Sequence, residues 1–441
     1  MGATMSGPGS APAVADGRRF GAARRRAIVA GSVGNAVEWT DWVLYATLAP
    51  FISGRFFPGD DETVKLLNTL AVFAVGFLMR PIGGAVLGGY ADRRGRKAGL
   101  TLTISLMAGA SLVIAVCPPY SSIGVAAPVI LLLARLVQGF SAGGEFASSS
   151  SFLVESAPPG RRAFAGSWQQ VSVGAGALIA SAIGAALTWL VPPGPMAEWG
   201  WRVGFAVGAL LGLVGLWVRV RADETDAFTA MVAQGRHTRT VRELARGVLA
   251  QPGGMLRVVG MNLAGTIAYY LFLTYMPGYA HKATGIPLDA ALLANTIGLV
   301  YYLAMIPLVA RAADRFGRRP VLLAFAVGLL AVAWPAFRIL EAGTFVAVLV
   351  VEVLGLTCLA CYSATIAAVM SEQFPARVRT TAMGFSYSLT VALFGGTAPY
   401  VTTWMQSRGL GGHVWLYPAV AAVIGVVVYA LMPETNDREL D

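Results

Sequence analysis

Residues 76–97 read GFLMRPIGGAVLGGYADRRGRK, and this stretch decides the fold class. Its first half is apolar and rich in glycine, with a single charge, Arg80, embedded in it. Its second half gathers five charges around a glycine: Asp92, Arg93, Arg94, Gly95, Arg96 and Lys97. A water-soluble protein rarely joins two such segments abruptly. The pattern is typical of a membrane helix that carries one buried charge and leaves the bilayer into a tight, basic cytoplasmic turn.

Composition places the chain among integral membrane proteins. Of its 441 residues, 56% are hydrophobic and 13% are charged, and the mean hydropathy is +0.64. A soluble domain carries roughly a quarter charged residues, about twice the share found here. The formal net charge of +10 by itself would suit a nucleic-acid-binding protein, so the placement of the basic residues along the chain has to decide.

Twelve apolar segments are long enough to cross a bilayer, which takes about 20 residues. We predict spans at 27–52, 66–90, 98–117, 125–153, 166–191, 202–219, 256–280, 288–311, 320–340, 344–372, 380–405 and 413–432. A polar segment separates the sixth span from the seventh. The predicted fold class is therefore an all-α membrane protein built from two six-helix halves.

The basic residues lie mostly on one side of this arrangement. With both termini inside the cell, 25 of the 33 Lys and Arg fall in cytoplasmic segments, and two, Arg80 and Arg135, lie within spans. The remaining six lie outside: Arg55, Lys65, Arg202, Lys282, Arg338 and Arg408. Cytoplasmic loops of membrane proteins carry such an excess of positive charge. Topology thus explains the basic composition, and we expect a multi-pass cell-membrane protein with cytoplasmic termini and no nucleic-acid partner.

The chain also repeats itself at close to half its length. The loop sequence DRRGRK at 92–97 recurs as DRFGRR at 314–319, 222 residues later. A second echo supports the repeat, because Glu155 precedes Arg162 by seven residues, as Glu372 precedes Arg379. Two six-helix repeats in parallel are an arrangement that alternating-access transporters use.

The spans and the repeat predict how the chain is divided. We expect a disordered cytoplasmic tail at 1–26, a first six-helix bundle at 27–219, a cytoplasmic central loop at 220–255, a second six-helix bundle at 256–432 and a cytoplasmic tail at 433–441.

These features together resemble the major facilitator superfamily over residues 27–435. The loop sequences GGYADRRGRK and ADRFGRR and the RLVQG at 135–139 carry that resemblance. A narrower resemblance is to the metabolite:proton symporter family. It rests on GNAVEWTDW at 34–42, with Asp41 inside it, GFLMRPIGG at 76–84, QGFSAGGEF at 138–146, WGWR at 199–202 and FGG at 394–396. That family includes alpha-ketoglutarate permeases, citrate–proton symporters and proline/betaine transporters. The resemblance implies two pseudo-symmetric halves and proton-coupled transport.

The first span carries two acidic residues on one face. Glu38 and Asp41 lie there with Tyr45 one turn further along, at spacings that place all three on the same side of a helix. A charge at the centre of a membrane helix costs about 2.5–3.5 kcal/mol, so this face should look into a central cavity. The carboxylates then either accept protons or balance a buried arginine. The structural alternative is a pair of satisfied charges near the helix end.

Two arginines lie inside predicted spans. Arg80, followed by Pro81, is a dozen residues from the basic loop, roughly 18 Å along a helix, so its charge needs a carboxylate of the protein or of a substrate. In the fourth span, Arg135, Gln138 and Glu145 share one face. The family resemblance associates an arginine at this RLxQG position with proton coupling, so we assign that role to Arg135 with Glu145 as a candidate partner. The alternative is a structural ion pair that holds helices together.

Other residues are candidates for lining a substrate site or for gating. The substrate-site candidates are Arg80, Arg135, Tyr45, Gln138, Gln169, Gln170, Tyr269, Tyr270 and Asn295, each of which could instead serve packing or an interhelical hydrogen bond. The resemblance implies gating by the repeated loops, through Asp92, Arg93, Gly95, Arg96, Asp314, Gly317 and Arg318. Glu352, in an apolar part of the tenth span, has no family position, and a proton site and an ion pair both stay open for it.

The predicted function is proton-coupled import of a small organic acid by alternating access. Two buried arginines suit a di- or tricarboxylate such as alpha-ketoglutarate or citrate. The alternative is a zwitterion such as proline or betaine, with aromatic rings holding the cationic group. The sequence has no GxxxxGK[ST] phosphate loop, and Cys358 and Cys361 lie in an apolar helix without histidines. We therefore expect a monomeric transporter rather than an enzyme, without cofactor or metal.

Overall fold

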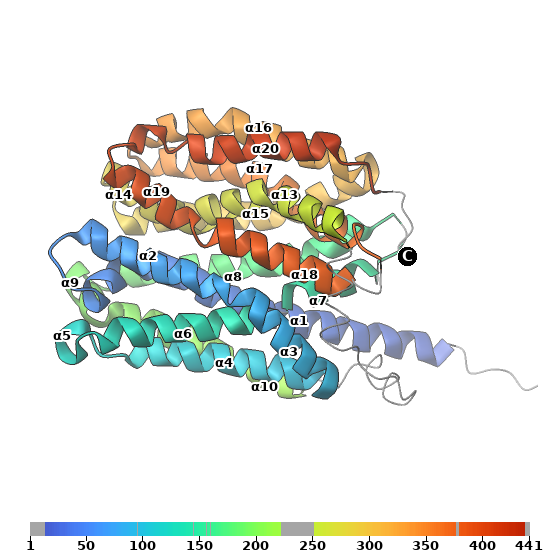
Figure 1. Cartoon of the computed structure of the whole chain (residues 1–441), viewed down its shortest axis with the longest axis horizontal. Coiled ribbons are helices and arrows are strands. Elements are labelled where there is room, and N and C mark those ends of the chain that lie inside the picture. Colours follow the sequence, from blue (N-terminus) through green and yellow to red (C-terminus); the bar gives the residue numbers. More distant parts are fainter. Residues whose placement is uncertain are drawn as a thin grey trace, which may run out of the picture.

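The computed structural model describes residues 14–94, 96–143, 145–155, 157, 158, 160–221, 251–375 and 379–436. Over these residues the chain forms helices and no strand. The first half of the chain, blue to green in Figure 1, lies below the second half, yellow to red, and the long helices of both run in the same general direction. The all-helical, two-part architecture predicted from the hydropathy is confirmed.

The helices of the first half are α1 (Val14–Phe56), α2 (Glu62–Leu78), α3 (Arg80–Arg94), α4 (Arg96–Val116), α5 (Tyr120–Ile123), α6 (Ala126–Ala142), α7 (Glu145–Glu155), α8 (Arg162–Leu190), α9 (Pro193–Pro195), the π-helix η1 (Met196–Gly200) and α10 (Trp201–Arg221). Those of the second half are α13 (Pro252–Ala268), the π-helix η2 (Tyr269–Tyr275), α14 (Met276–Thr284), α15 (Leu288–Phe316), α16 (Arg318–Leu340), α17 (Phe345–Ser371), α18 (Arg379–Thr390), the π-helix η3 (Val391–Gly395), α19 (Ala398–Ser407), the 3₁₀-helix η4 (Gly411–His413) and α20 (Leu416–Leu431).

Each predicted span falls on one helix or on two or three consecutive helical segments of the described chain. Nine helical segments of the described chain are long and apolar enough to cross a membrane, and α6 is a shorter apolar helix. The first and eleventh predicted spans fall on α1 and on α18 to α19. Helix α1 starts at Val14, within the segment expected to be the N-terminal tail. Helices suit a bilayer because they satisfy their own backbone hydrogen bonds.

The second predicted span bends at the residue that carries its charge. Helix α2 ends at Leu78 and α3 begins at Arg80, and the N–H of Met79 between them donates to the carbonyl of Gly76 at 3.3 Å. Pro81 follows, and a proline has no N–H to continue the ladder. The bend places Arg80 at the first turn of a new helix rather than in the middle of a straight one.

Glycines let the backbone of this bent span touch α6. A methyl group built on Gly139 would lie 1.8 Å from the carbonyl oxygen of Gly76. One on Gly83 would lie 1.8 Å from the carbonyl oxygen of Phe140, and one on Gly143 would lie 2.0 Å from that of Arg80. The GFLMRPIGG and QGFSAGG sequences therefore form a crossing of two helices at backbone contact, which fixes Arg80 and Arg135 relative to each other.

The two halves meet along several helices. Helix α8 of the first half packs along α15 and α17 of the second, and α2 packs against η3 and α19. At the end of the bundle where α7 and α18 approach each other in Figure 1, Glu434 after α20 also contacts the start of α16. Among the described residues that the sequence places inside spans, Glu38, Asp41, Arg80, Arg135 and Glu352 are buried.

Candidate functional site

The acidic face of α1 lies inside the protein. Glu38, Asp41 and Tyr45 are all buried, with exposed fractions of 7%, 2% and 0%. Trp39 and Trp42 on the same helix are buried as well. The two carboxylates therefore avoid the lipid, as their insertion cost requires.

Asp41 forms an ion pair with Arg135. Its Oδ2 lies 3.7 Å from Nη1 of Arg135, which also donates a hydrogen bond to Oε1 of Gln138 at 2.6 Å. The Gln138 amide donates to Oδ2 of Asp41, and the hydroxyl of Ser111 on α4 donates to Oδ1. Since Arg135 is fully buried, these contacts let its charge stay away from water. The carboxylate that balances a buried arginine is thus Asp41.

Arg80 is surrounded by aromatic rings, and it forms no ion pair with a carboxylate among the residues that the structure describes. Its Cζ lies 4.6 Å from the ring centroid of Phe77, 4.7 Å from that of Trp42 and 5.1 Å from that of Trp39, and we call these three rings the aromatic cage. The side chain is 3% exposed, and Nε and Nη2 have no hydrogen-bond partner among the described residues. Cation–π contacts stabilise the charge, but a guanidinium offers five N–H donors that the rings do not satisfy.

One indole contacts both arginines. The centroid of the Trp42 ring lies 4.1 Å from Cζ of Arg135 and 4.7 Å from Cζ of Arg80. Arg135 Nε and Nη2 are also buried without a hydrogen-bond partner in the described chain. Tyr45 completes the surroundings of Arg135, with its ring centroid 4.3 Å from Cζ and its hydroxyl donating to the carbonyl of Thr69 at 3.1 Å.

Two tyrosines of the second half meet the aromatic cage. The ring centroid of Tyr269 lies 5.4 Å from that of Trp39, and the centroid of Tyr270 lies 5.4 Å from that of Phe77. Both hydroxyls are buried and have no hydrogen-bond partner among the described residues. The same holds for Oγ1 of Thr274 on the same π-helix. Buried polar groups are normally hydrogen-bonded, so this region holds unused donors from both halves.

The other predicted lining residues have different surroundings. Gln169 accepts a hydrogen bond from Ser149 through Oε1, while its Nε2 has no partner in the described chain, and Gln170 is buried beside it. Asn295 uses its amide within the second half, where it donates to Oε1 of Glu352 at 2.8 Å and to the carbonyl of Phe272 at 3.3 Å. Asn295 is therefore tied to Glu352 in this arrangement.

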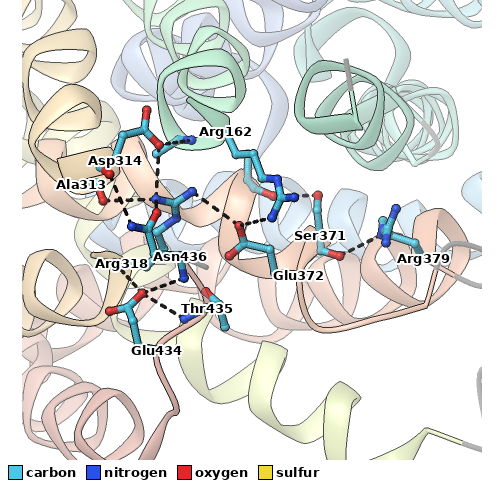
Figure 2. Close-up of polar contacts among 12 residues, drawn as sticks. Arg162, Ala313, Asp314, Arg318, Ser371, Glu372, Arg379, Glu434, Thr435 and Asn436 are labelled. Carbon is cyan, nitrogen blue, oxygen red and sulfur yellow. Dashed lines mark hydrogen bonds and ion pairs between the residues drawn. The ribbon is translucent and has the colours of Figure 1, made fainter. Parts of the chain in front are cut away.

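Charged residues gather at one end of the bundle in a group we call the polar end cluster, formed by Arg162, Asp314, Arg318, Glu372, Glu434 and Asn436 (Figure 2). Asp314 accepts hydrogen bonds from the N–H groups of Ala163 and Phe164, both at 2.9 Å, so it binds the first turn of α8 in the opposite half. Arg318 lies 3.2 Å from Asp314 and 3.5 Å from Glu372. The second copy of the repeated loop thus connects the halves.

The glutamate and arginine of the repeated Glu–Arg motif form ion pairs with their counterparts in the opposite half. Arg162 of the first half lies 3.7 Å from Glu372 of the second, and Arg379 of the second half lies 2.7 Å from Glu155 of the first. Each half therefore supplies one acid and one base to a reciprocal pair. The two pairs differ in burial, because the side chain of Glu372 is 0% exposed and that of Glu155 is 47% exposed.

The segment after α20 completes the polar end cluster. Glu434 accepts hydrogen bonds from the N–H groups of Arg318 and Arg319 at 2.9 and 3.0 Å, and Asn436 accepts one from the Arg318 guanidinium. Gly317 has a φ of +99°, and a methyl group there would lie 2.5 Å from the Glu434 carboxylate. Burial acts to raise the pKa of Glu434, but the four backbone N–H groups around it hold that pKa below its ordinary value.

Burial dominates at the neighbouring acid. It raises the pKa of Glu372, and the opposing effects of Arg318, the Thr435 hydroxyl and Arg162 offset that rise only in part. The surroundings of Glu372 and Glu434 thus shift the pKa of these two acids in opposite directions.

Comparison with known proteins identifies the family. The family model of the Major Facilitator Superfamily matches residues 31–389 and 287–440. The chain is 36% identical over 416 residues to the alpha-ketoglutarate permease of Escherichia coli strain K12, covering 93% of this chain and 94% of that protein. The chain belongs to the Major Facilitator Superfamily. It is accordingly a membrane transporter, and the family resemblance seen in the sequence is confirmed.

Further Major Facilitator Superfamily relatives differ in what their names say they carry. The citrate-proton symporter of Klebsiella pneumoniae is 36% identical over 91% of this chain and 89% of its own length. The proline/betaine transporter of Salmonella typhimurium strain LT2 is 33% identical over 94% of this chain and 85% of its own length. A partially occluded inward open structure of the xylose transporter XylE from E. coli shares the fold, with a TM-score of 0.76, 18% identity and coverage of 94% and 98%.

Several predicted residues of this Major Facilitator Superfamily chain lie outside the described residues. These are Gly95 and the side chains of Asp92, Arg93, Arg96 and Glu145. Most of the predicted central loop, at 222–250, lies outside them too. The gating role of the first loop and the pairing of Glu145 with Arg135 stay predictions.

Sequence reasoning missed three features of the site. Ser111 is a lone serine in an apolar span, which is too weak a signal to predict a contact with Asp41. The position of Trp42 between two arginines depends on how three helices cross. Glu434 accepts a hydrogen bond from the N–H of Arg318 at the start of α16. The one sign of this contact in the sequence is an acid that follows a proline just after the last span.

Proposed function

We propose that this transporter is a proton-coupled symporter that imports a small di- or tricarboxylate, such as alpha-ketoglutarate or citrate. The observation that carries the proposal is Arg80, which is buried in the aromatic cage and makes no ion pair with a carboxylate of the described chain. Its two unpartnered nitrogens suit a bidentate contact with a substrate carboxylate. The names of the two relatives at 36% identity support this substrate class.

The neighbouring ion pair offers a way to couple protons to substrate. Asp41 and a second substrate carboxylate would compete for Arg135, because both are anions that a guanidinium binds. Protonation of Asp41 removes its charge and frees Arg135 for the substrate. Proton and substrate then bind together, as symport requires. Glu38, on the same face of α1, is a further proton-coupling candidate, and Tyr269 and Tyr270 contribute hydroxyls from the second half.

The polar end cluster is proposed as the cytoplasmic gate. Its ion pairs join the two halves, so they must separate when that end opens. This assignment places both termini in the cytoplasm, in agreement with the excess of basic residues on that side. The two bundles at 27–219 and 256–432 would move against each other within a monomer.

Transport of a zwitterion such as proline or betaine ranks second. It is favoured by the 33% identical proline/betaine transporter and by the aromatic rings of the site. The rings of the aromatic cage, however, already contact the Arg80 guanidinium. A substrate cation there would lie beside a fixed positive charge, which disfavours it.

Uptake into proteoliposomes tests the proposal. Labelled alpha-ketoglutarate, citrate, proline and betaine are offered with and without an inward proton gradient, and we expect gradient-driven accumulation of a carboxylate. The variant Arg80→Lys keeps the charge but loses the fork, and we expect it to weaken substrate binding at least tenfold. Arg338→Lys, at an exposed arginine paired with Glu341, is the matched control. Uptake driven by sodium alone, or wild-type kinetics in Arg80→Lys, would contradict the proposal.

A further inference from the structure

Glu352 is a buried acid that the proposed substrate site does not use. It lies in α17 within the apolar sequence VLVVEVLGL and is 0% exposed. Its Oε1 accepts a hydrogen bond from Asn295 at 2.8 Å, and its Oε2 has no partner in the described chain. Gly298 lies against its Cβ, so that α15 covers this part of the side chain.

Basic side chains on the surrounding helices are engaged elsewhere. Helix α17 packs against α15, α16, α8, α7, α13, η2, α18 and α14. The basic residues of these helices contact other groups. Arg162, Arg318 and Arg379 form ion pairs at the polar end, and Arg311 and Arg315 stack on Phe164 and Phe316. The others donate hydrogen bonds: Arg257 to Gly253, Lys282 to Thr63, Arg319 to Ala430 and Arg338 to Glu341. Glu352 therefore forms no ion pair within the described residues.

The other ionisable groups around α17 do not bond Glu352 either. The tyrosines of α15 bond Thr357 and Ser363, Tyr275 bonds Thr403, and His281 bonds the carbonyl of Ile286. The remaining tyrosines and acids on the neighbouring helices form no hydrogen bond with Glu352 among the described contacts. These are Tyr269 and Tyr270 on η2, Tyr279 on α14, Tyr387 on α18, Glu155 on α7, and Asp289 and Asp314 on α15. Asn295, a neutral amide, is its one polar partner in the described chain.

An ionised carboxylate is poorly accommodated in such a place. A buried charge needs a partner of opposite sign or several hydrogen bonds, whereas a neutral carboxylic acid loses far less on burial. One amide donor is enough for the carbonyl oxygen of a neutral acid. Asp41 shows what an ionised carboxylate has in the same molecule, namely an arginine and two further donors.

Glu352 also lies near the end of the bundle opposite the polar end cluster. It is seven residues after Phe345, the first residue of α17, roughly 10 Å along the helix. A cavity of about 480 Å³ lies at that end, lined among others by Tyr279, Lys282, Arg338, Glu341 and Gln406. A proton entering from that side would have a short distance to travel.

We propose that Glu352 is a second proton-binding site, in the second half of the transporter. It holds its proton in this arrangement and releases it when the halves move and the polar end opens. The O–H bond of the acid breaks, the proton passes to water, and the carboxylate is left until the opposite end opens again. The proposal rests on the proposed function in one respect, the inward movement of protons with substrate. It adds one proton per cycle to the one assigned to Asp41.

An infrared measurement tests the protonation without any substrate. The purified protein in lipid at neutral pH should show a carboxylic-acid C=O band that is absent in Glu352→Gln and present in the control Glu341→Gln, an exposed acid near the same end. Asn295→Leu keeps the acid and removes its donor, so the band should move to higher frequency. This second variant decides the assignment if Glu352→Gln does not fold. A spectrum that neither variant changes overturns the proposal.

The coupling ratio tests the role in transport. The proton-to-substrate ratio of the reconstituted protein is measured from the membrane potential at which uptake reverses. Glu352→Gln should carry one proton fewer per substrate and keep substrate counterflow. The control Glu62→Gln, at an exposed acid paired with Lys65, should match the wild type. An unchanged ratio in Glu352→Gln overturns the second site. If the wild-type protein shows no counterflow of any carboxylate, the proposed substrate class is wrong. The infrared test of the protonation of Glu352 does not depend on that result.

Discussion

In the first half, Asp41 lies 3.7 Å from Arg135 and accepts hydrogen bonds from Ser111 and Gln138, whereas in the second half Glu352 receives one hydrogen bond, from Asn295. Both acids are buried in membrane helices, but their partners differ. The first half holds a carboxylate as an ion beside an arginine, and the second holds one as an acid among neutral groups. The same residue chemistry thus suits charge recognition in one half and proton storage in the other.

Two groups of glycines, one in each half, face different neighbours. Where the bent second span crosses α6 in the first half, glycines face backbone, and a methyl group on Gly139 would lie 1.8 Å from the carbonyl oxygen of Gly76. In the second half Gly265, Gly355 and Gly395 face aromatic rings, and a methyl group on Gly355 would lie 2.3 Å from the ring of Phe272. Backbone contact fixes the spacing of two helices, while a ring against glycine can shift its rotamer. A methyl group at the crossing with α6 is therefore harder to accommodate than one placed against a ring.

Neutralising each buried acid gives the largest expected difference between the halves. Asp41→Asn leaves Arg135 without its counter-ion, and we expect the free energy of unfolding to fall by roughly 3 to 5 kcal/mol. Glu352→Gln replaces a neutral acid by a neutral amide, and we expect a change of about 1 kcal/mol or less. Denaturant unfolding in lipid micelles measures both. Equal losses in the two variants would remove the distinction between an ion and an acid.

The reciprocal pairs allow a comparison at the polar end. Glu372→Gln weakens a buried pair with Arg162 and Arg318, and we expect the closed arrangement to lose about 1.5–3 kcal/mol. Glu155→Gln removes a half-exposed partner of Arg379 and should cost about 0–1 kcal/mol.

The readout for these pairs is accessibility. Ser167→Cys, at a buried position near the start of α8, is labelled with a water-soluble maleimide after Cys117, Cys358 and Cys361 have been replaced. We expect labelling to rise roughly tenfold or more with Glu372→Gln, as a loss of about 1.4 kcal/mol or more implies, and little with Glu155→Gln. A larger rise with Glu155→Gln would show that burial does not determine the strength of the pairs.

Adding a methyl group to one glycine of each half tests the difference in packing. Gly139→Ala and Gly355→Ala should each lower the free energy of unfolding by about 1–3 kcal/mol. Phe272→Leu should restore part of the stability of Gly355→Ala, because the ring is what the new methyl group meets. Gly139→Ala meets a backbone oxygen, so trimming a side chain cannot relieve it. Gly109→Ala, with open space around it, is the control. Rescue of Gly139→Ala by a neighbouring side-chain truncation would contradict this account.

The smallest expected effect concerns Glu434, whose pKa lies below the ordinary value. Its stabilising contribution is present above the ordinary carboxyl pKa of about 4.3 and is lost as the pH falls through the lower folded value. At neutral pH we expect Glu434→Gln to cost about 0.5 kcal/mol, since solvent screens this exposed side chain. The difference from wild type should shrink as the pH falls, which unfolding at several pH values measures. A difference that grows in acid would show that the sign is wrong.

Much of the fold could be predicted because the bilayer restricts what the backbone can do. A chain in lipid has to satisfy its own hydrogen bonds, so long apolar segments become helices wherever they occur. The predicted spans accordingly fall on helices of the described chain, whereas the break between α2 and α3 was found only in the structure. The contacts of the site could not be predicted in the same way, because whether Asp41 pairs with Arg80 or with Arg135 depends on the rotation and crossing of separate helices.

The sequence by itself determined the helical membrane fold, its two halves and the acids and bases placed inside spans, because hydropathy, length and charge asymmetry are properties of the chain alone. Only the tertiary structure decided which charges are paired. It pairs Asp41 with Arg135 and places Arg80 among aromatic rings and Glu352 beside Asn295. It also pairs each glutamate of the repeated Glu–Arg motif with the arginine of the opposite half. An ion pair needs contact within a few ångströms, and helix packing sets such distances between residues far apart in the chain.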